Sequence, residues 1–327
     1  MFIIMFINFN TQNILQWFNA GLLILLVYLC YIYYDEIDII NIVWYFFSGI
    51  LLSCLLAFLF MSLTIEKSLF NVCIDGRFQG LTQNPNTLHI LCVISISILL
   101  ILWFKNKINN YLIWILTGLF SLIGIITKSK AFLICLLLMV FIIGVLVLIK
   151  YKKRGIPICA IIFLICICCF FVFKDGFMDI FKRFSEYSYN NIMDVILTGR
   201  WSIWKQYLIE WSKNFYSVFL GLGVTANKIN NMSVHNTYIE LLYYFGVLGM
   251  LIIMLLIYSY LRLVKEKNKR IKCGVNLIPL IMFLFLSIEE SLLFTFIIPF
   301  IMILYLIFDK NEKSKEQYKE LKKGDVE

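Results

Sequence analysis

The sequence predicts an all-α, polytopic integral membrane protein with one large polar loop in its interior. Of its 327 residues, 61% are hydrophobic and 15% are charged, whereas soluble domains carry about a quarter charged residues. The apolar runs are continuous rather than alternating, which is typical of helices that satisfy every backbone group within a bilayer. A net charge of +9 in such a chain is explained by basic cytoplasmic loops, so no nucleic-acid partner is expected.

About nine stretches are long enough to span a bilayer, for which a helix of about 20 residues is needed. They predict a single membrane domain over residues 1–327. The predicted helices are 14–33, 39–63, 88–104, 111–127, 131–149, 156–173, 237–261, 275–289 and 292–308. The last two are short and are equally compatible with one broken hairpin.

The distribution of Lys and Arg predicts which segments face the cytoplasm. Most of the 29 basic residues lie in short segments, namely 105–107, 150–154, 262–272 and the charged tail 309–327. Short basic loops remain in the cytoplasm, whereas long loops cross the membrane regardless of charge. The large loop 174–236, the loop 64–87 and the turn 128–130 are therefore expected to face outward together.

The ten cysteines do not predict a disulfide framework. Nearly all lie in apolar runs, where a thiol packs as a small hydrophobic group, and only Cys73 falls in an outward loop. The outward loops also lack an Asp-x-Asp pair or a His and Asp cluster with the spacing of a metal site. We therefore expect neither a cofactor nor a metal ion.

Two outward cations are candidates for binding an anion. Arg77 is the only arginine of its loop and lies between Gly76 and Gly80, which permit a folded, non-helical backbone. Lys130 follows Ser129 in the short turn between two apolar runs. The alternatives are an ordinary surface arginine at position 77 and a lysine at position 130 that snorkels to the membrane interface.

A third cation, Arg200, begins a predicted interfacial helix within the large loop. The Thr198-Gly199 turn precedes it, and Trp201 and Trp204 follow it. A helix N-terminus presents free N–H groups and the positive end of the helix dipole, so an adjacent arginine would complete an anion site. The alternatives are a plain surface charge for the arginine and, for the tryptophans, either stacking on sugar rings or anchoring at the interface.

His235 is the candidate catalytic residue. It stands where the large loop meets an apolar run, beside Asn236 and with Glu240 about one helical turn deeper. A carboxylate inside a membrane helix is costly and by default indicates function, so Asn236 and Glu240 are expected to support the imidazole. A lone histidine at a helix entrance is more often a capping or interfacial residue, and His89, which begins another span without such neighbours, is expected to be interfacial.

The order of these motifs resembles the O-antigen ligase and O-antigen polysaccharide polymerase family. The matching features are, in order, Arg77-Phe78-x-Gly80, Asn84-Pro85-Asn86, the Ser129-Lys130 turn, Thr198-Gly199-Arg200 with Trp204, Gly221-x-Gly223, and His235-Asn236 with Gly246-x-x-Gly249. The resemblance covers about residues 75–260, and its most specific part is the His-Asn segment that closes one large outer loop. The chain departs from the family at Lys130, where an arginine is usual; lysine keeps the charge but loses the bidentate fork.

This resemblance implies a metal-independent glycosyltransferase on the outer face of the bacterial cytoplasmic membrane. It would polymerise or ligate oligosaccharide units carried on polyprenyl pyrophosphate, alongside other membrane proteins of polysaccharide assembly. Arg77, Lys130 and Arg200 would neutralise the pyrophosphate, and His235 would be the general base on the acceptor hydroxyl.

Two other classes are weighed against this one. A transporter or flippase of a lipid-linked saccharide or another anion predicts interrupted helices and internal repeats near the middle of the membrane, and neither is indicated by the sequence. A non-catalytic membrane scaffold is the third class, which the cluster of outward cations disfavours.

Overall fold

The structure, a computed structural model, is described for most of the central part of the chain. The described residues are 39–62, 73–74, 76–82, 84–157, 160, 164, 193–194, 199–223, 226, 229, 232–267, 278–290 and 292. Within them the chain is mostly helical, which confirms the helical class. The predicted helices 14–33 and 292–308, most of 156–173 and of the large loop before residue 199, and the tail 309–327 lie outside the described residues.

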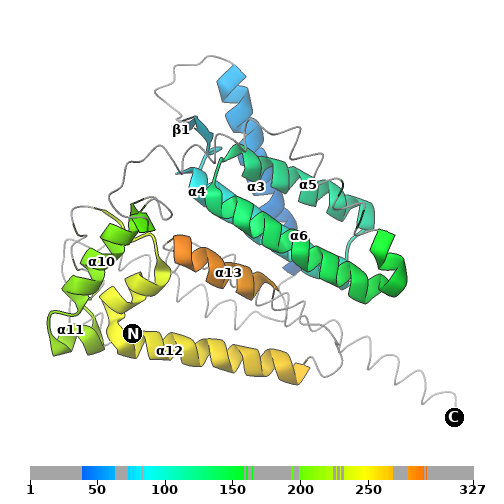
Figure 1. The fold of residues 1–327 in the computed structure, drawn as a ribbon. Helices are drawn as coiled ribbons and strands as arrows, with labels where there is room; N and C mark the ends of the chain where they lie inside the picture. The colour runs from blue at the N-terminus through cyan, green and yellow to red at the C-terminus, as the bar shows by residue number, and fades with distance from the viewer. Residues whose placement is uncertain are drawn as a thin grey trace, which may run out of the picture.

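Five helices form one bundle around α4 (Figure 1). They are α3 (Ile39–Ser62), α4 (Pro85–Phe104), α5 (Asn110–Ile126), α6 (Lys130–Tyr151) and α13 (Ile278–Glu289). Helix α4 packs against α5, α6 and α13 and is buried along most of its length. A short 3-10 turn, η2 (Lys152–Arg154), follows α6.

Three of these helices are long and apolar enough to cross a membrane. The apolar stretches are Ile40–Phe60, Pro85–Phe104 and Lys130–Ile149. Shorter apolar helical stretches, below the length of a full span, occur at Asn110–Ile126, Thr237–Ile252 and Leu280–Glu289. The three long helices indicate an integral membrane protein, as predicted, within the part of the chain that is described.

The helix starts follow from capping chemistry. The side chain of Asn84 accepts a hydrogen bond from the Thr87 N–H, and Pro85 occupies the first turn of α4, where its missing N–H costs nothing. The helix therefore starts three residues before the predicted position 88. Ser129 caps α6 in the same way by accepting from the Phe132 N–H, which stabilises the helix end.

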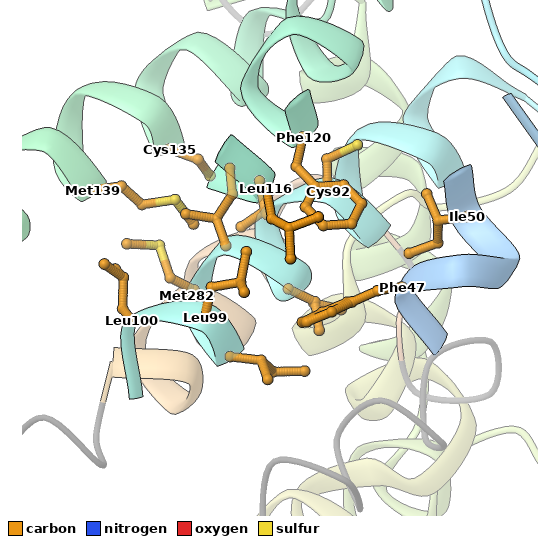
Figure 2. Close-up of a cluster of buried hydrophobic side chains, with 14 of the residues drawn as sticks. Phe47, Ile50, Cys92, Leu99, Leu100, Leu116, Phe120, Cys135, Met139 and Met282 are labelled. Carbon is orange, nitrogen blue, oxygen red and sulfur yellow. The ribbon is translucent and has the colours of Figure 1, made fainter. Parts of the chain in front are cut away.

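The core of the bundle is a continuous apolar cluster shared by all five helices (Figure 2). Phe47 of α3 and Phe120 of α5 are in ring contact, and Met282 of α13 is fully buried within the same cluster. Cys92 and Cys135 are buried and unbridged, which agrees with their predicted role in packing. The apolar face of α13 is thereby fixed against α4, and the polar end of α13 is held at one end of the bundle.

Three further helices form a second unit beside this bundle. They are α10 (Arg200–Trp211), α11 (Phe215–Leu220) and α12 (Thr237–Lys267), and both α10 and α11 pack on α12 (Figure 1). A small core of Trp204, Tyr207, Val234 and Tyr243 joins α10 to the segment that leads into α12. Trp204 is therefore a buried packing residue, and the prediction that it stacks on a sugar or anchors at the interface is wrong.

Helix α12 is broken at Gly246, where the backbone adopts φ 63° and ψ −167° (Figure 1). The break frees the carbonyl oxygens of Tyr243 and Tyr244, which accept hydrogen bonds from the N–H groups of Leu222 (2.8 Å) and Gly223 (3.0 Å). The predicted continuous helix 237–261 is thus two helical segments. The reason is that this backbone conformation is essentially restricted to glycine and the 221–223 loop replaces the lost helical hydrogen bonds.

A two-strand hairpin, β1 (Cys73–Ile74) and β2 (Arg77–Phe78), precedes α4. Gly76 makes the turn between the strands with φ 68°, a conformation that glycine adopts without strain. The folded, non-helical backbone predicted around Arg77 is confirmed, although the strands themselves were not predicted.

Candidate functional site

The polar centre of the structure is the carboxylate of Glu290, at the C-terminal end of α13. It accepts hydrogen bonds from Asn86 Nδ2 (2.6 Å) and from Arg200 Nη2 (3.4 Å) at Oε1, and Oε2 lies 2.9 Å from His235 Nδ1. These partners come from α4, from the first residue of α10, and from the residue two before α12. Three segments far apart in the sequence therefore meet on one acid.

Arg77 belongs to the same network through Asn86. Its Nη2 donates to Asn86 Oδ1 (2.7 Å) and its Nε donates to the Thr127 carbonyl (2.9 Å). The second contact reaches the turn between α5 and α6, so the structure brings the first outer loop and the 127–130 turn together. Lys130 is the first residue of α6 and has a half-buried side chain.

Arg200 is directed towards the end of α13 rather than towards its own helix N-terminus. Its Nη1 donates to the Glu289 carbonyl (2.6 Å) and lies 3.7 Å from Glu289 Oε1. The N–H of Ser202, which has no partner within the helix because it lies in the first turn of α10, donates to Asp194 Oδ1 (2.9 Å). The anion position predicted at this helix N-terminus is therefore occupied by Asp194, because an acidic side chain satisfies the same N–H group and dipole.

The loop that carries His235 is fixed by two aromatic side chains of α10. Trp204 Nε1 donates to the Val234 carbonyl (2.8 Å) and Tyr207 OH donates to the Met232 carbonyl (2.7 Å). Val234 is buried in the small core, whereas Ser233 and His235 are partly exposed. Ser233 Oγ lies 2.8 Å from His235 Nε2.

Asn236 and Thr237 tie the start of α12 to the end of α13. Asn236 Oδ1 accepts from the Tyr238 and Ile239 N–H groups, which caps α12, and its Nδ2 donates to the Ile288 carbonyl (3.1 Å). Thr237 Oγ1 donates to the Glu290 carbonyl (2.7 Å). The structure gives Asn236 a positioning role for the helix ends that carry the histidine and the acid.

The electrostatic environment keeps Glu290 ionised. Burial alone would raise the pKa of this carboxyl, but the hydrogen bond and charge of His235, the charge of Arg200 and the hydrogen bond from Asn86 outweigh it and hold the pKa below its usual value. An ionised carboxylate only accepts hydrogen bonds. His235 therefore presents Nδ1–H to Glu290, and in the neutral imidazole Nε2 is the acceptor that faces Ser233.

Glu240 does not take the position expected of it. The carboxylate in contact with His235 is Glu290, whereas Glu240 lies near Tyr207, whose pKa is raised by burial and further by the Glu240 charge. A spacing of one helical turn predicts contact only when both residues lie in the helix, and His235 precedes α12 in a left-handed conformation with φ 47°.

His89 is also placed differently from its prediction. It is fully buried in α4, with Nε2 3.5 Å from Glu289 Oε2 and its ring edge-on to Phe132. The interfacial assignment is wrong because α13 covers this face of α4 and brings a carboxylate to it. His89 thus lies under the same acidic pair that holds Arg200.

Glu289 and Glu290 are the site residues that the sequence interpretation missed. They end a short apolar segment, 278–288, that was treated only as part of a membrane hairpin. The signal was present, because two adjacent carboxylates in an apolar stretch are costly unless they are paired.

The apolar helices and this network define a helical membrane protein with a partly buried, charged cluster at the end of its helical bundle. Among the described residues, no group of three or more His, Cys, Asp or Glu side chains could hold a metal ion, and metal independence stays a prediction. Comparison of the chain with protein-family models, with curated proteins and with solved structures gives no match.

Proposed function

We propose that this protein is a membrane glycosyltransferase that polymerises or ligates oligosaccharide units carried on polyprenyl pyrophosphate. The observation that carries the proposal is the network in which Arg77, Arg200 and His235 meet through Asn86 and Glu290. Cationic donors and a histidine beside apolar helices suit a substrate with an anionic head and a lipid tail. The proposed location is the outer face of the bacterial cytoplasmic membrane, with a cytoplasmic C-terminus.

The two arginines would bind the pyrophosphate of the donor. Each guanidinium offers a planar fork of donors that matches a phosphate, and Arg200 is only 17% exposed, so its charge is weakly screened. A phosphate would take over donors that now contact Glu290 and Asn86. Lys130, at the turn that Arg77 reaches, is proposed as a third cation.

His235 would take the proton of the acceptor hydroxyl. The hydroxyl oxygen attacks the anomeric carbon of the donor sugar, the bond from that carbon to the pyrophosphate oxygen breaks, and the proton passes to Nε2. The negative charge that develops on the leaving pyrophosphate is neutralised by the arginines. Glu290 holds Nδ1–H at 2.9 Å and stabilises the imidazolium that forms, as an acid does in other histidine-based sites.

One observation favours a second candidate, a transporter or flippase of a lipid-linked anion. Helix α12 is interrupted at Gly246, and interrupted helices are typical of transporter binding sites. The two candidates differ in whether a covalent bond is made. Purified protein in liposomes that moves a lipid-linked saccharide between leaflets without lengthening it would support the transporter.

The test of the transferase is a reaction of the purified full chain with a polyprenyl-pyrophosphate-linked oligosaccharide, in the presence of EDTA. We expect longer or transferred glycan from the wild type. His235→Ala should reduce the rate by roughly 10²–10⁴-fold, as expected for loss of a general base, at unchanged abundance in the membrane.

The matched control is Lys213→Ala, an exposed residue of the same unit, which should react like the wild type. His89→Ala is unsuitable as a control because that ring is buried. A His235→Ala protein that transfers at the wild-type rate would overturn the proposal, and activity that requires added magnesium or manganese would overturn its metal independence.

A further inference from the structure

Ser233, His235 and Glu290 form a continuous chain of polar contacts that the transferase reaction does not require in full. Ser233 Oγ lies 2.8 Å from His235 Nε2, and His235 Nδ1 lies 2.9 Å from Glu290 Oε2. A hydroxyl, an imidazole and a carboxylate joined in this order are the parts of a serine nucleophile with its base and orienting acid. We propose that Ser233 is an activated nucleophile for carboxylic esters, with His235 as its general base.

The direction of each hydrogen bond supports this assignment. Glu290 is an acceptor because it is ionised, so the imidazole carries its proton on Nδ1. In the neutral imidazole the lone pair on Nε2 then faces Ser233, and the hydroxyl is the donor.

The backbone fixes the positions of Ser233 and His235 relative to each other. Buried Val234 lies between them, and its carbonyl accepts from Trp204 Nε1 at 2.8 Å. The side chains of Ser233 and His235 lie on the same side of the segment, since Ser233 Oγ is 2.8 Å from His235 Nε2. His235 itself has φ 47°, a conformation that is strained for a residue other than glycine and that is maintained by its contacts on both ring nitrogens.

The reacting groups are accessible from outside the protein. The His235 side chain is 40% exposed, whereas that of Glu290 is only 12% exposed. Ser233 is also partly exposed. The acid is therefore largely covered by its donors, whereas the base and the hydroxyl are open to a substrate, as a nucleophile and its base must be.

The reaction is complete with water as the second substrate. Ser233 Oγ attacks the ester carbonyl carbon while its proton moves to His235 Nε2. The bond from that carbon to the alkoxy oxygen breaks, and the alcohol leaves with the proton from Nε2. Water then attacks the acyl-serine and gives a proton to Nε2, the carboxylic acid is released, and the serine recovers its proton.

The experiment is labelling of the purified full-length protein with a fluorophosphonate probe, followed by mass spectrometry of the modified peptide. We expect the adduct on Ser233 in the wild type, a readout that needs no variant. Glu290→Gln should slow labelling by up to about 10⁴-fold, the effect of the acid-to-amide change in serine proteases. Hydrolysis of p-nitrophenyl acetate should fall in parallel.

The matched controls separate a reactive serine from a surface serine. Ser212, in the same unit, donates only to the Ile209 carbonyl and is exposed, so Ser212→Ala should be labelled at the wild-type rate. Ser233→Ala should not be labelled, with its elution in size-exclusion chromatography unchanged. No adduct on Ser233 in the wild type at saturating probe, or a wild-type labelling rate in Glu290→Gln, would overturn the proposal.

Discussion

Replacement of Glu290 by alanine should destabilise the protein far more than loss of a surface acid. The carboxylate is shared by Asn86, Arg200 and His235 at 2.6, 3.4 and 2.9 Å. Its removal takes one of two acidic partners from Arg200, which is 17% exposed and keeps Glu289, and it leaves Asn86 Nδ2 and His235 Nδ1 without this acceptor. Breaking a buried ion pair in this way costs about 3–5 kcal/mol.

Glu290→Gln should cost less than Glu290→Ala. The amide oxygen can still accept from Asn86 and Arg200, so what is lost is the charge on those contacts and the bond to His235 Nδ1. Hydrogen bonds to charged groups contribute about 1.5–3 kcal/mol, which sets the expected cost of this variant. The contacts therefore predict that Glu290→Ala loses the most stability, that Glu290→Gln loses less, and that the wild type is the most stable of the three.

The assay is thermal unfolding of the detergent-purified protein, followed by the fluorescence of its seven tryptophans. At about 2 °C per kcal/mol for a chain of this size, Glu290→Ala should lower Tm by roughly 6–10 °C. The control is Glu210→Ala, whose side chain is 39% exposed and pairs with exposed Lys213, a type of pair that contributes about 0–1 kcal/mol. A Glu290→Ala shift no larger than the Glu210→Ala shift would refute the network as the polar core of the site.

Three further predictions follow from particular contacts. Gly246→Ala should lower Tm by several degrees, because a Cβ there would lie 2.4 Å from the Phe219 carbonyl oxygen in a backbone conformation of φ +63°; Gly118→Ala, whose Cβ meets nothing within 4 Å, is the control in the same thermal assay. The pKa of Glu290 is lowered, so its ionised form stabilises the fold at pH values above its ordinary pKa of 4.5, and this stability is lost as the pH falls through the lowered pKa. Tm measured on acidification should therefore fall more steeply in the wild type than in Glu290→Gln. Equal slopes would contradict this. Lys130→Arg should retain donor binding and Lys130→Ala should lose it in a lipid-donor binding assay, whereas equal binding by all three proteins would remove this lysine from the site.

Much of the helical frame could be predicted from the sequence. Continuous apolar runs located α3 to α6 to within a few residues, because hydropathy and length alone determine where a helix can span a bilayer. The start of α4 differs from the predicted position because Asn84 caps the helix and Pro85 begins it, so the helix includes polar residues that hydropathy does not assign to a span. The break at Gly246 could not be predicted, because it depends on the distant 221–223 loop supplying the missing hydrogen bonds.

The site was only half predictable. Arg77, Arg200 and His235 were selected from local chemistry and motif order, and they do meet, but the acid that joins them was not selected. Glu290 is separated from Asn86 by 204 positions, so no local pattern links the two. The sequence points to Glu240 instead, because a spacing of about one helical turn predicts contact within a helix, and His235 lies just outside α12, where that rule does not apply.

The position of Glu290 along the chain has a consequence for how the protein is made. Every partner of this acid is synthesised before it, the earliest by 204 residues, and N-terminal segments fold first during synthesis. Arg200 and His235 therefore lack this carboxylate until α13 docks against α4. A polypeptide that ends before residue 290 would have most of its membrane frame and all of its site cations, yet we predict that it would be inert.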